Sequence, residues 1–481
     1  MTSQTDGSVE LADGESASSI LFEVLTAAVA QFPEALRDVQ LPATQQAFRK
    51  DYPQCLPRFE AVRLASNQRL DIARHLVEST GKRLVWRVGN QELALPQRLE
   101  KRVDPLVLRR VETATGGWSP NLIYRGERWP ATELADYADH LVSRNMITPA
   151  AGSALTWLQD NVLLDGRLHL TDRKIVVMGA NAEMAASRSW LESGASVLWL
   201  DVAAPPLQWI DSAHPIGNLS WCESGADLLT QPNEILSTIL AFADGDPVDL
   251  ALYAYAPGQA REMRLTSSMS EIVNALPTAL IRSITLLVSP TTPTQLNAED
   301  LELMQARHKQ RPSWEAGLDR LGLLGGWGGE QYHDSATTRT VVDIQGASYQ
   351  AAQYLGKIQM AECWANFGQP AGEKPLPLRV SANTAAITRT RSLNHPVFAA
   401  AFGGAAALGV ETFTPRQSRQ VNGLLAVHDW LIPTPPVPGQ IRVHGGIHTL
   451  PYPLSSALRI AAAIGFARSP RLPRGLVIGS R

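Results

Sequence analysis

The chain has 481 residues, of which 44% are hydrophobic and 19% are charged, and its formal net charge is −3 at pH 7. This is an ordinary globular composition for two or three domains, and it excludes disorder over most of the length. The slight negative charge gives no electrostatic footprint for nucleic acid, so we expect no nucleic-acid partner.

Cysteine usage and the N-terminus indicate the compartment. The three cysteines are odd in number and too far apart for a zinc motif, so we expect no metal and a reducing environment. Residues 1–19 contain four acidic side chains and no Lys or Arg, which predicts a disordered tail rather than a secretory signal. The most apolar run, Pro396 to Val410, is shorter than the roughly 20 residues that span a bilayer. We therefore expect a cytoplasmic protein with no membrane span.

Residues 20–165 show helical periodicity in several places. Apolar residues recur at helical spacing from Ser19 to Ala30 and from Ser66 to Ser79, and a further helix is expected from Thr132. The segment from Arg83 to Leu95 alternates instead, as a strand does. We expect a mainly helical N-terminal domain over these residues, and no catalytic motif stands out in it.

From Asp172 onward, short apolar runs alternate with helical segments, which is the pattern of βαβ units. The expected strands are Lys174–Gly179, Ser196–Asp201, Val248–Ala256, Ile281–Ser289 and Leu378–Ala382. The expected helices are Glu183–Glu192, Asn233–Ala243, Glu262–Ala279, Ser348–Asn366 and Arg416–Trp430. Right-handed crossovers between these strands predict an α/β fold with a doubly wound, mostly parallel, Rossmann-like sheet over residues 166–432.

Two segments extend this unit. Residues 290–347 are too long for a passive connection, so we expect a lid or small subdomain, with the glycine-rich segment around Trp327 covering the substrate. Residues 433–481 begin with a proline-rich connector and end in an apolar helix. They are expected to form a C-terminal extension that packs on the sheet.

A glycine follows the first strand of the predicted sheet. Gly179-Ala-Asn-Ala182 begins the turn into the next helix, where a pyrophosphate can approach backbone N–H groups, including those of Asn181 and Ala182. Asp201 follows that glycine by 22 residues, close to the offset of an acid that binds the ribose hydroxyls of NAD. The turn therefore predicts NAD as cofactor, with NADP left open. An ordinary strand-to-helix turn is the competing interpretation, because only one of the usual three glycines is present.

Three later segments have counterparts in a known family. The turn Tyr253-Ala-Tyr-Ala-Pro-Gly258 looks like a strand-end turn that lines a dinucleotide, which assigns Ala256 and Gly258 to cofactor binding. Ser289 stands where that family carries a serine that hydrogen-bonds a substrate carbonyl. The segment from Leu378 to Thr388, with Thr384, is similar to the loop that closes over the nicotinamide. Over residues 172–432 the chain thus resembles the short-chain dehydrogenase/reductase superfamily, as a divergent member near its enoyl-reductase branches.

The helix from Gln345 to Lys357 carries the remaining catalytic candidates that the resemblance implies. In the family a tyrosine moves the proton at the substrate oxygen, and a lysine four residues later lowers the pKa of the phenol. Both Tyr354 with Lys357 and Tyr349 with Lys357 stay open as the pair; the second is about 12 Å apart along a helix. A strict alignment on Tyr349 places Gln353 at the lysine position and predicts weak or absent turnover.

The resemblance implies an NAD(P)-dependent oxidoreductase that acts on a carbonyl or conjugated double bond of a bulky or carrier-linked small-molecule substrate. Ser289 would orient the substrate oxygen, Tyr349 or Tyr354 would move the proton, and Lys357 would tune the tyrosine. Two alternatives stay open: a catalytically degenerate Rossmann-fold binding or scaffold protein, and a cofactor-independent hydrolase or lyase on the same sheet. A homo-oligomeric assembly is also left open.

Overall fold

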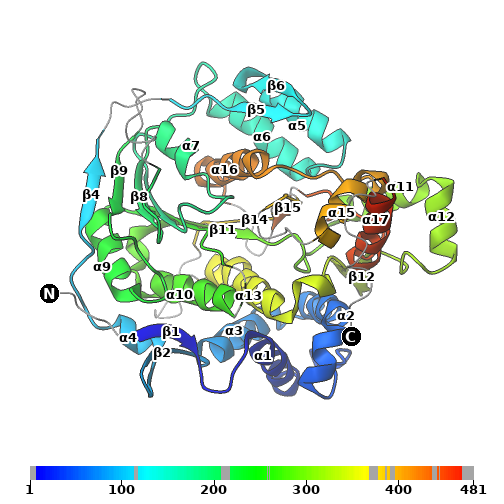
Figure 1. Cartoon of the computed structure of the whole chain (residues 1–481), viewed down its shortest axis with the longest axis horizontal. Helices are drawn as coiled ribbons and strands as arrows, with labels where there is room; N and C mark the ends of the chain where they lie inside the picture. The colour runs from blue at the N-terminus through cyan, green and yellow to red at the C-terminus, as the bar shows by residue number, and fades with distance from the viewer. Residues whose placement is uncertain are drawn as a thin grey trace.

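An eight-stranded sheet runs through the middle of the protein in this computed structural model (Figure 1). The structure describes residues 7–112, 117–206, 217–256, 258, 260–367, 378–384, 387–390, 396–435, 441–443 and 445–468. The strand order is β15-β14-β11-β10-β7-β8-β9-β4, in which the first seven strands run parallel and the edge strand β4 is antiparallel to β9. The strands are β4 (Leu108–Val111), β7 (Lys174–Met178), β8 (Ser196–Leu200), β9 (Leu219–Cys222), β10 (Val248–Leu252), β11 (Ile281–Val288), β14 (Val380–Thr384) and β15 (Arg442–Val443).

This arrangement confirms the predicted α/β class and the mostly parallel sheet. The chain starts the parallel sheet at β7 in its middle and adds strands first on one side and then on the other, which is the order of a doubly wound, Rossmann-like sheet. All five predicted strands are present with shifts of one to four residues at their ends. Three further strands of this eight-stranded sheet were not predicted: β4, β9 and β15.

Helices cover both faces of the sheet, and alternate side chains of the central strands β7, β8 and β10 enter two different cores. In β7, Ile175 and Val177 pack into one core, while Val176 and Met178 pack into the other. Helices of the first face are α5 (Leu134–Ser143), α6 (Pro149–Asn161), α7 (Ser187–Glu192) and α16 (Pro415–Leu431); helices of the second are α9 (Pro232–Ala243) and α10 (Arg261–Ala275). Strands buried on both faces explain the continuous apolar runs that identified them in the sequence.

Helix α13 (Ala347–Ile358) lies on the second face beside α10 and connects the sheet to the N-terminal helices (Figure 1). It continues as a π-helix (Gln359–Trp364) and α14 (Ala365–Phe367). Its other side packs in one core with α1 (Ala17–Gln31), α2 (Gln45–Ala65) and α3 (Arg69–Gly81). Residues 7–11, expected in a disordered tail, form strand β1, and Ser16 caps α1 through its side chain.

The remainder of the N-terminal third is distributed over the molecule. Strand β1 (Gly7–Leu11) pairs with β2 (Leu84–Val88), which pairs with β3 (Gln91–Ala94), and α4 (Leu95–Leu99) follows. The hairpin β5 (Asn121–Tyr124) and β6 (Glu127–Pro130) joins α5 and α6 on the opposite face of the sheet. Residues 20–165, expected as one domain, therefore contribute to the cores on both faces.

The insertion and the C-terminal extension lie together at one end of the sheet (Figure 1). The insertion forms α11 (Ala298–Lys309), α12 (Ser313–Arg320), β12 (Gly329–Tyr332) and β13 (Ser335–Thr338). In the C-terminal extension, β15 joins the sheet edge and α17 (Leu454–Arg468) packs on α15 (Pro396–Gly404). Within the ranges given above, no helix is long and apolar enough to cross a membrane.

Candidate functional site

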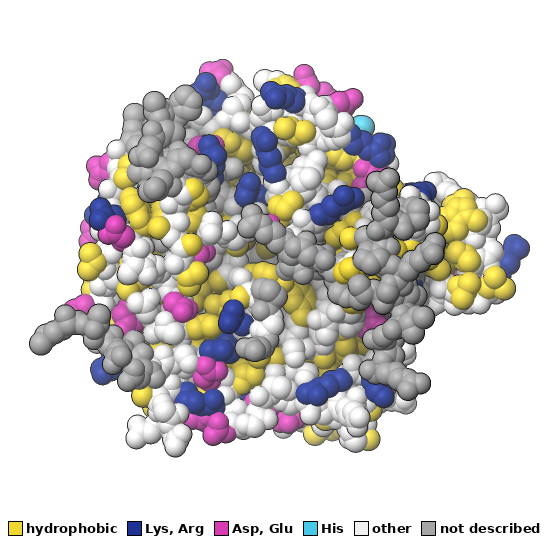
Figure 2. All heavy atoms as spheres, in the orientation of Figure 1, with side chains coloured by type: hydrophobic (Ala, Val, Ile, Leu, Met, Phe, Trp, Pro, Cys, Tyr) yellow, Lys and Arg dark blue, Asp and Glu magenta, His cyan; other side chains and the backbone are white. Residues whose placement is uncertain are grey.

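A cavity of about 1170 Å³ lies at the carboxyl ends of β7, β10 and β11. In open α/β sheets this edge is where ligands bind. Figure 2 shows hydrophobic side chains gathered in the middle of this face of the molecule, between the layers that Figure 1 labels α16 above and α10 and α13 below. Of the predicted site residues, Ser289, Tyr349, Asn181, Ala182 and Gly258 line the cavity.

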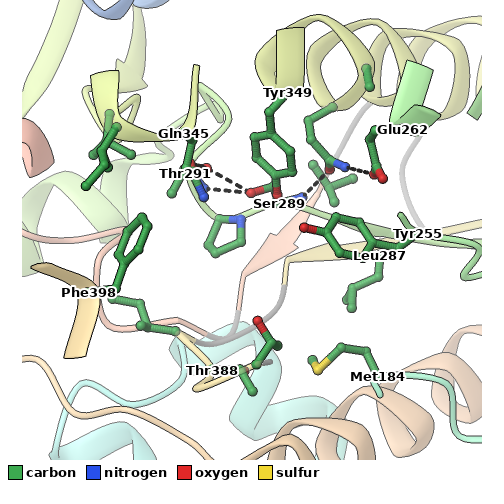
Figure 3. A pocket seen from close by; sticks show the side chains of 18 of the residues that line it. Met184, Tyr255, Glu262, Leu287, Ser289, Thr291, Gln345, Tyr349, Thr388 and Phe398 are labelled. Atoms are coloured by element: carbon green, nitrogen blue, oxygen red, sulfur yellow. Dashed lines mark hydrogen bonds between the residues drawn. The ribbon is translucent and has the colours of Figure 1, made fainter. Parts of the chain in front are cut away.

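Ser289 and Tyr349 meet at the polar end of this cavity (Figure 3). The serine directly follows β11, and the tyrosine projects from the first turn of α13, so that their hydroxyl groups lie close together at this end of the cavity. Ser289 Oγ also lies 2.9 Å from Thr291 Oγ1, which donates to Gln345 Oε1 at 2.7 Å. Burial raises the pKa of Tyr349 above its ordinary value, and Glu262 adds to the rise. At neutral pH this phenol is a hydrogen-bonding group that keeps its proton.

Gln353 and Glu262 stand next to this pair. Gln353 lies one turn after Tyr349 on α13, at the position where the strict alignment expects a lysine. Its Oε1 accepts from the Ser289 backbone N–H at 3.1 Å, and its Nε2 donates to Glu262 Oε1 at 2.7 Å. Because a glutamine carries no positive charge, it cannot lower the pKa of Tyr349 as a lysine would.

Tyr354 and Lys357 are on the other side of α13, away from the cavity lining. Tyr354 donates to Glu60 Oε2 at 2.7 Å, and Lys357 Nζ donates to Glu60 Oε1 and to the Pro293 carbonyl, each at 2.5 Å. Lys357 and Tyr354 are 3% and 0% exposed. Glu60 also accepts two hydrogen bonds from Arg63, which links it to Glu362 in a fully buried ionic cluster. The geometry therefore gives these two residues a structural environment between α13 and α2.

The backbone N–H groups that the turn after Gly179 would offer to a dinucleotide already donate within the protein. Gly179 N donates to the Leu200 carbonyl, Asn181 N to Asp201 Oδ2 at 3.0 Å, and Ala182 N to the Gly179 carbonyl at 3.0 Å. Asp201 Oδ1 accepts from the Ala203 N–H at 3.1 Å. A diphosphate would have to break these bonds, so the turn does not fit one in this conformation.

The helix that follows the same turn also argues against a diphosphate site. The expected helix from Glu183 starts only at Ser187, and α7 has six residues, so no long helix begins at the glycine. Gly179 itself has φ +84°, and a Cβ there would lie 2.3 Å from the Ala254 backbone N. Glycine is thus required for the close approach of the turn to the end of β10, whether or not a ligand binds.

Of the other predicted cofactor contacts, Gly258 lines the cavity, whereas Ala256 and Thr384 are not among the lining residues. The Ala256 N–H donates to Glu262 Oε2 at 3.1 Å. Thr384 ends β14 and is 1% exposed. Within the part of the cavity wall that the structure describes, none of the side chains is Lys, Arg or His, and the carboxylates are those of Glu15, Glu183 and Glu262. Such a wall has no cation to hold a phosphate.

The far end of the cavity is apolar and is formed by α15, the following 3-10 turn (Ala405–Leu408) and α17. The two helices touch closely: a Cβ at Gly404 would lie 1.9 Å from the Ala461 carbonyl oxygen, and one at Gly465 would lie 1.9 Å from that of Ala400. The side chains that they present to the cavity include Phe398, Ala401, Phe402, Leu408, Leu454 and Leu458. Trp327, expected to cover the substrate, is not among the lining residues and packs with Leu296 and Met304.

Comparison with known proteins adds no relative. No protein-family model matches the chain, and no curated protein matches it. The resemblance to short-chain dehydrogenases therefore stays a prediction.

Sequence reasoning missed Glu262 and the apolar wall. Glu262 was included only in an expected helix, although a charged residue directly after a strand-end turn is a usable signal for a site at the carboxyl edge of a sheet. The run from Pro396 to Val410 was considered only as a membrane span, and its abundance of Ala and Gly does signal a closely packed helix pair.

Proposed function

We propose that this chain binds a small molecule with a large apolar part, in the cavity at the carboxyl edge of its Rossmann-like sheet, and that it does so without short-chain dehydrogenase chemistry. This is the catalytically degenerate alternative that the sequence left open. The observation that carries it is the position of Lys357: the ammonium is bound to Glu60 and the Pro293 carbonyl, while Gln353 stands next to Ser289 and Glu262.

The cavity supports binding in two ways. Its volume of about 1170 Å³ lies just above the usual range of small-molecule sites, roughly 300 to 1,000 Å³, and such sites are mainly apolar with a few convergent polar groups. Ser289, Tyr349 and Glu262 supply such polar groups at one end, and the helices α15 and α17 supply the apolar surface at the other. Because the N–H groups of the Gly179 turn already donate within the protein, we expect the chain to bind its ligand without a nicotinamide coenzyme.

A neutral fluorescent dye tests this proposal. Nile red should bind to the full chain with enhanced emission, and aliphatic alcohols should displace it. Leu287 points into the cavity from β11 (Figure 3), so Leu287→Trp should fill the space and weaken dye binding at least about tenfold. Leu240→Trp is the matched control, because Leu240 is 36% exposed on α9 and is not a lining residue.

A parallel titration with NADH and NADPH discriminates against the oxidoreductase interpretation. We expect no saturable change in coenzyme fluorescence with the wild-type protein. Saturable binding that Asp201→Ala abolishes would overturn the proposal and restore the redox function, and equal dye binding by the Leu287→Trp variant would show that the cavity is not the binding site.

A further inference from the structure

Glu262 is a buried carboxyl group that faces the cavity without a cationic partner in the described structure. It lies in the first turn of α10, is 7% exposed and lines the cavity. Its two oxygens accept hydrogen bonds from the amide of Gln353 at 2.7 Å and from the Ala256 N–H at 3.1 Å, and both donors are neutral. The ionised form is therefore hydrogen-bonded, but its charge is not balanced.

The other two lining carboxylates have different surroundings. Glu15 forms an ion pair with Arg83 at 2.6 Å and accepts a hydrogen bond from Ser19. Glu183 lies in the turn after β7 near Arg419; burial lowers the pKa of that guanidinium, and the negative charge of Glu183 acts against this shift. Glu262 is thus the one of these three for which the structure gives no interaction with a positive charge, and it is the one at the polar end of the cavity.

Two tyrosines surround the same end. Figure 3 shows Tyr349 and Tyr255 on neighbouring sides of the space in front of Glu262, one from α13 and the other from the turn after β10. Tyrosine rings attract cations through their faces, and their hydroxyl oxygens accept hydrogen bonds from ammonium groups. A carboxylate and tyrosines around one space form a suitable site for a positively charged group.

The apolar end of the cavity determines the chemical character of the rest of the ligand. Phe398, Phe402 and Leu458 belong to the wall that α15 and α17 build, and no described side chain on the cavity wall offers a cation to an anionic ligand. A ligand that satisfies both ends has a protonated amine at one end and an aliphatic or aromatic body at the other.

We propose that the cavity selects amphiphiles with a protonated amine, whose ammonium group pairs with the Glu262 carboxylate while the apolar body lies along α15 and α17. This inference rests on the proposed binding function, since it names the ligand class of the same cavity.

Proton release accompanies such binding. Burial raises the pKa of Glu262 to about 8, so that the carboxyl group of the free protein is mainly neutral at pH 7. An ammonium group favours the ionised carboxylate, and its binding should release close to one proton at that pH. Tyr349 faces Glu262 from α13, and because burial raises its pKa it keeps its proton over this range, while the neighbouring amide of Gln353 does not titrate. Affinity for the amine should therefore rise between about pH 6 and pH 8.

Three ligands with the same alkyl chain test the head group by calorimetry: dodecylamine, dodecanol and dodecanoate, each below its micelle concentration. We expect dodecylamine to bind at least about tenfold more tightly than dodecanol, and dodecanoate to bind most weakly. Glu262→Gln should remove the preference for the amine and leave the affinity for dodecanol within about threefold. Glu302→Gln, which changes the same type of residue on the exposed surface of α11 and outside the cavity lining, should retain the preference.

The wild-type protein alone provides a second readout. Titrations with dodecylamine in two buffers of different ionisation enthalpy should show the release of one proton, and titrations with dodecanol should show none. Equal affinities for amine and alcohol, a preference for dodecanoate, or amine binding with no proton release would overturn the inference while the apolar binding function stands. Failure of all three ligands to bind would overturn the proposed function itself.

Discussion

Helix α13 separates two buried carboxyl groups that differ in their surroundings. On one side, Glu60 is 1% exposed and accepts hydrogen bonds from Arg63, Lys357 and Tyr354. Burial alone would raise its pKa, but the charges of Arg63 and Lys357 outweigh burial and hold the pKa of Glu60 below its ordinary value. This carboxylate is ionised and fully partnered by the protein.

On the other side, Glu262 is 7% exposed and has only neutral donors, Gln353 and Ala256. Burial dominates there, and the pKa of Glu262 rises to about 8. Two carboxyl groups of the same type, buried to a similar degree, thus have pKa values shifted in opposite directions.

The comparison shows that the protein itself balances the charge of Glu60, whereas a cation that balances Glu262 would have to come from a ligand. A buried ion cluster with good geometry fixes the packing of the elements that carry it. A buried carboxyl group with no cation beside an open cavity costs stability whenever it ionises, and sites that tolerate such a cost are often functional. Lys357 belongs to the first situation, and Glu262 belongs to the second.

The largest expected effect comes from breaking the partnered side. Lys357→Met removes one cation from Glu60 and leaves the Pro293 carbonyl without its donor. We expect the free energy of unfolding to fall by about 3 kcal/mol, as measured by urea denaturation with tryptophan fluorescence. Nile red affinity should stay unchanged, because Lys357 is not among the cavity-lining residues. A variant with wild-type stability but no binding would place Lys357 in the site.

The absence of a cationic partner for Glu262 should make the free energy of unfolding depend on pH. The folded-state pKa of Glu262 is about 8 and the ordinary value is 4.5, so between these values the folded protein holds a proton that the unfolded chain has lost. The free energy of unfolding should therefore decrease as pH rises through this interval, by up to about 1.4 kcal/mol per pH unit from this group.

Urea denaturation at several pH values, for the wild-type protein and Glu262→Gln, measures this contribution as the difference between their slopes. Without this group, the slope of the free energy of unfolding against pH should be less negative in the Gln variant, whatever its absolute stability. Glu302→Gln, on the exposed surface of α11, should retain the wild-type slope. Parallel curves for the wild type and Glu262→Gln would contradict the unpartnered state of this carboxyl group.

The sheet was predictable from the sequence because its physical cause is local. Strands such as Ile281–Val288 are buried on both faces, so the apolar run that identifies them is visible without tertiary information. The strands that were missed are short or at an edge: β15 has two residues, and β4 has an exposed, basic middle in Arg109 and Arg110. Periodicity cannot detect such segments.

The site was less predictable because it depends on which side of a helix faces the cavity. Tyr349, Gln353, Tyr354 and Lys357 are all on α13, and residue spacing alone leaves more than one pairing geometrically acceptable. The deciding contact is with Glu60, which is nearly 300 residues away in sequence. The spacing in the sequence allows Lys357 to face the cavity. In the structure, Glu60 of α2 draws it into a buried ion cluster on the opposite side of α13.

The smallest expected change in stability comes from Asp201. Like Glu262, this carboxylate accepts hydrogen bonds from neutral donors only, but it lies nearer to the surface. Its oxygens accept from the backbone N–H groups of Asn181 and Ala203, and Asp201→Asn keeps the shape while replacing one acceptor with an amide donor. We expect a loss of about 1 kcal/mol in the free energy of unfolding and no change in Nile red affinity.

The same variant decides between the two uses of this carboxylate. If Asp201 only holds the turn, NADH should fail to bind to either the wild type or Asp201→Asn, and the variant should differ in stability alone. If it grips a ribose, the wild type should bind NADH, and Asp201→Asn should weaken that binding with little effect on unfolding. Because Asn181 N–H cannot donate to Asp201 and to a diphosphate at once, coenzyme binding would require the turn to rearrange, which amide hydrogen exchange at Asn181 would detect.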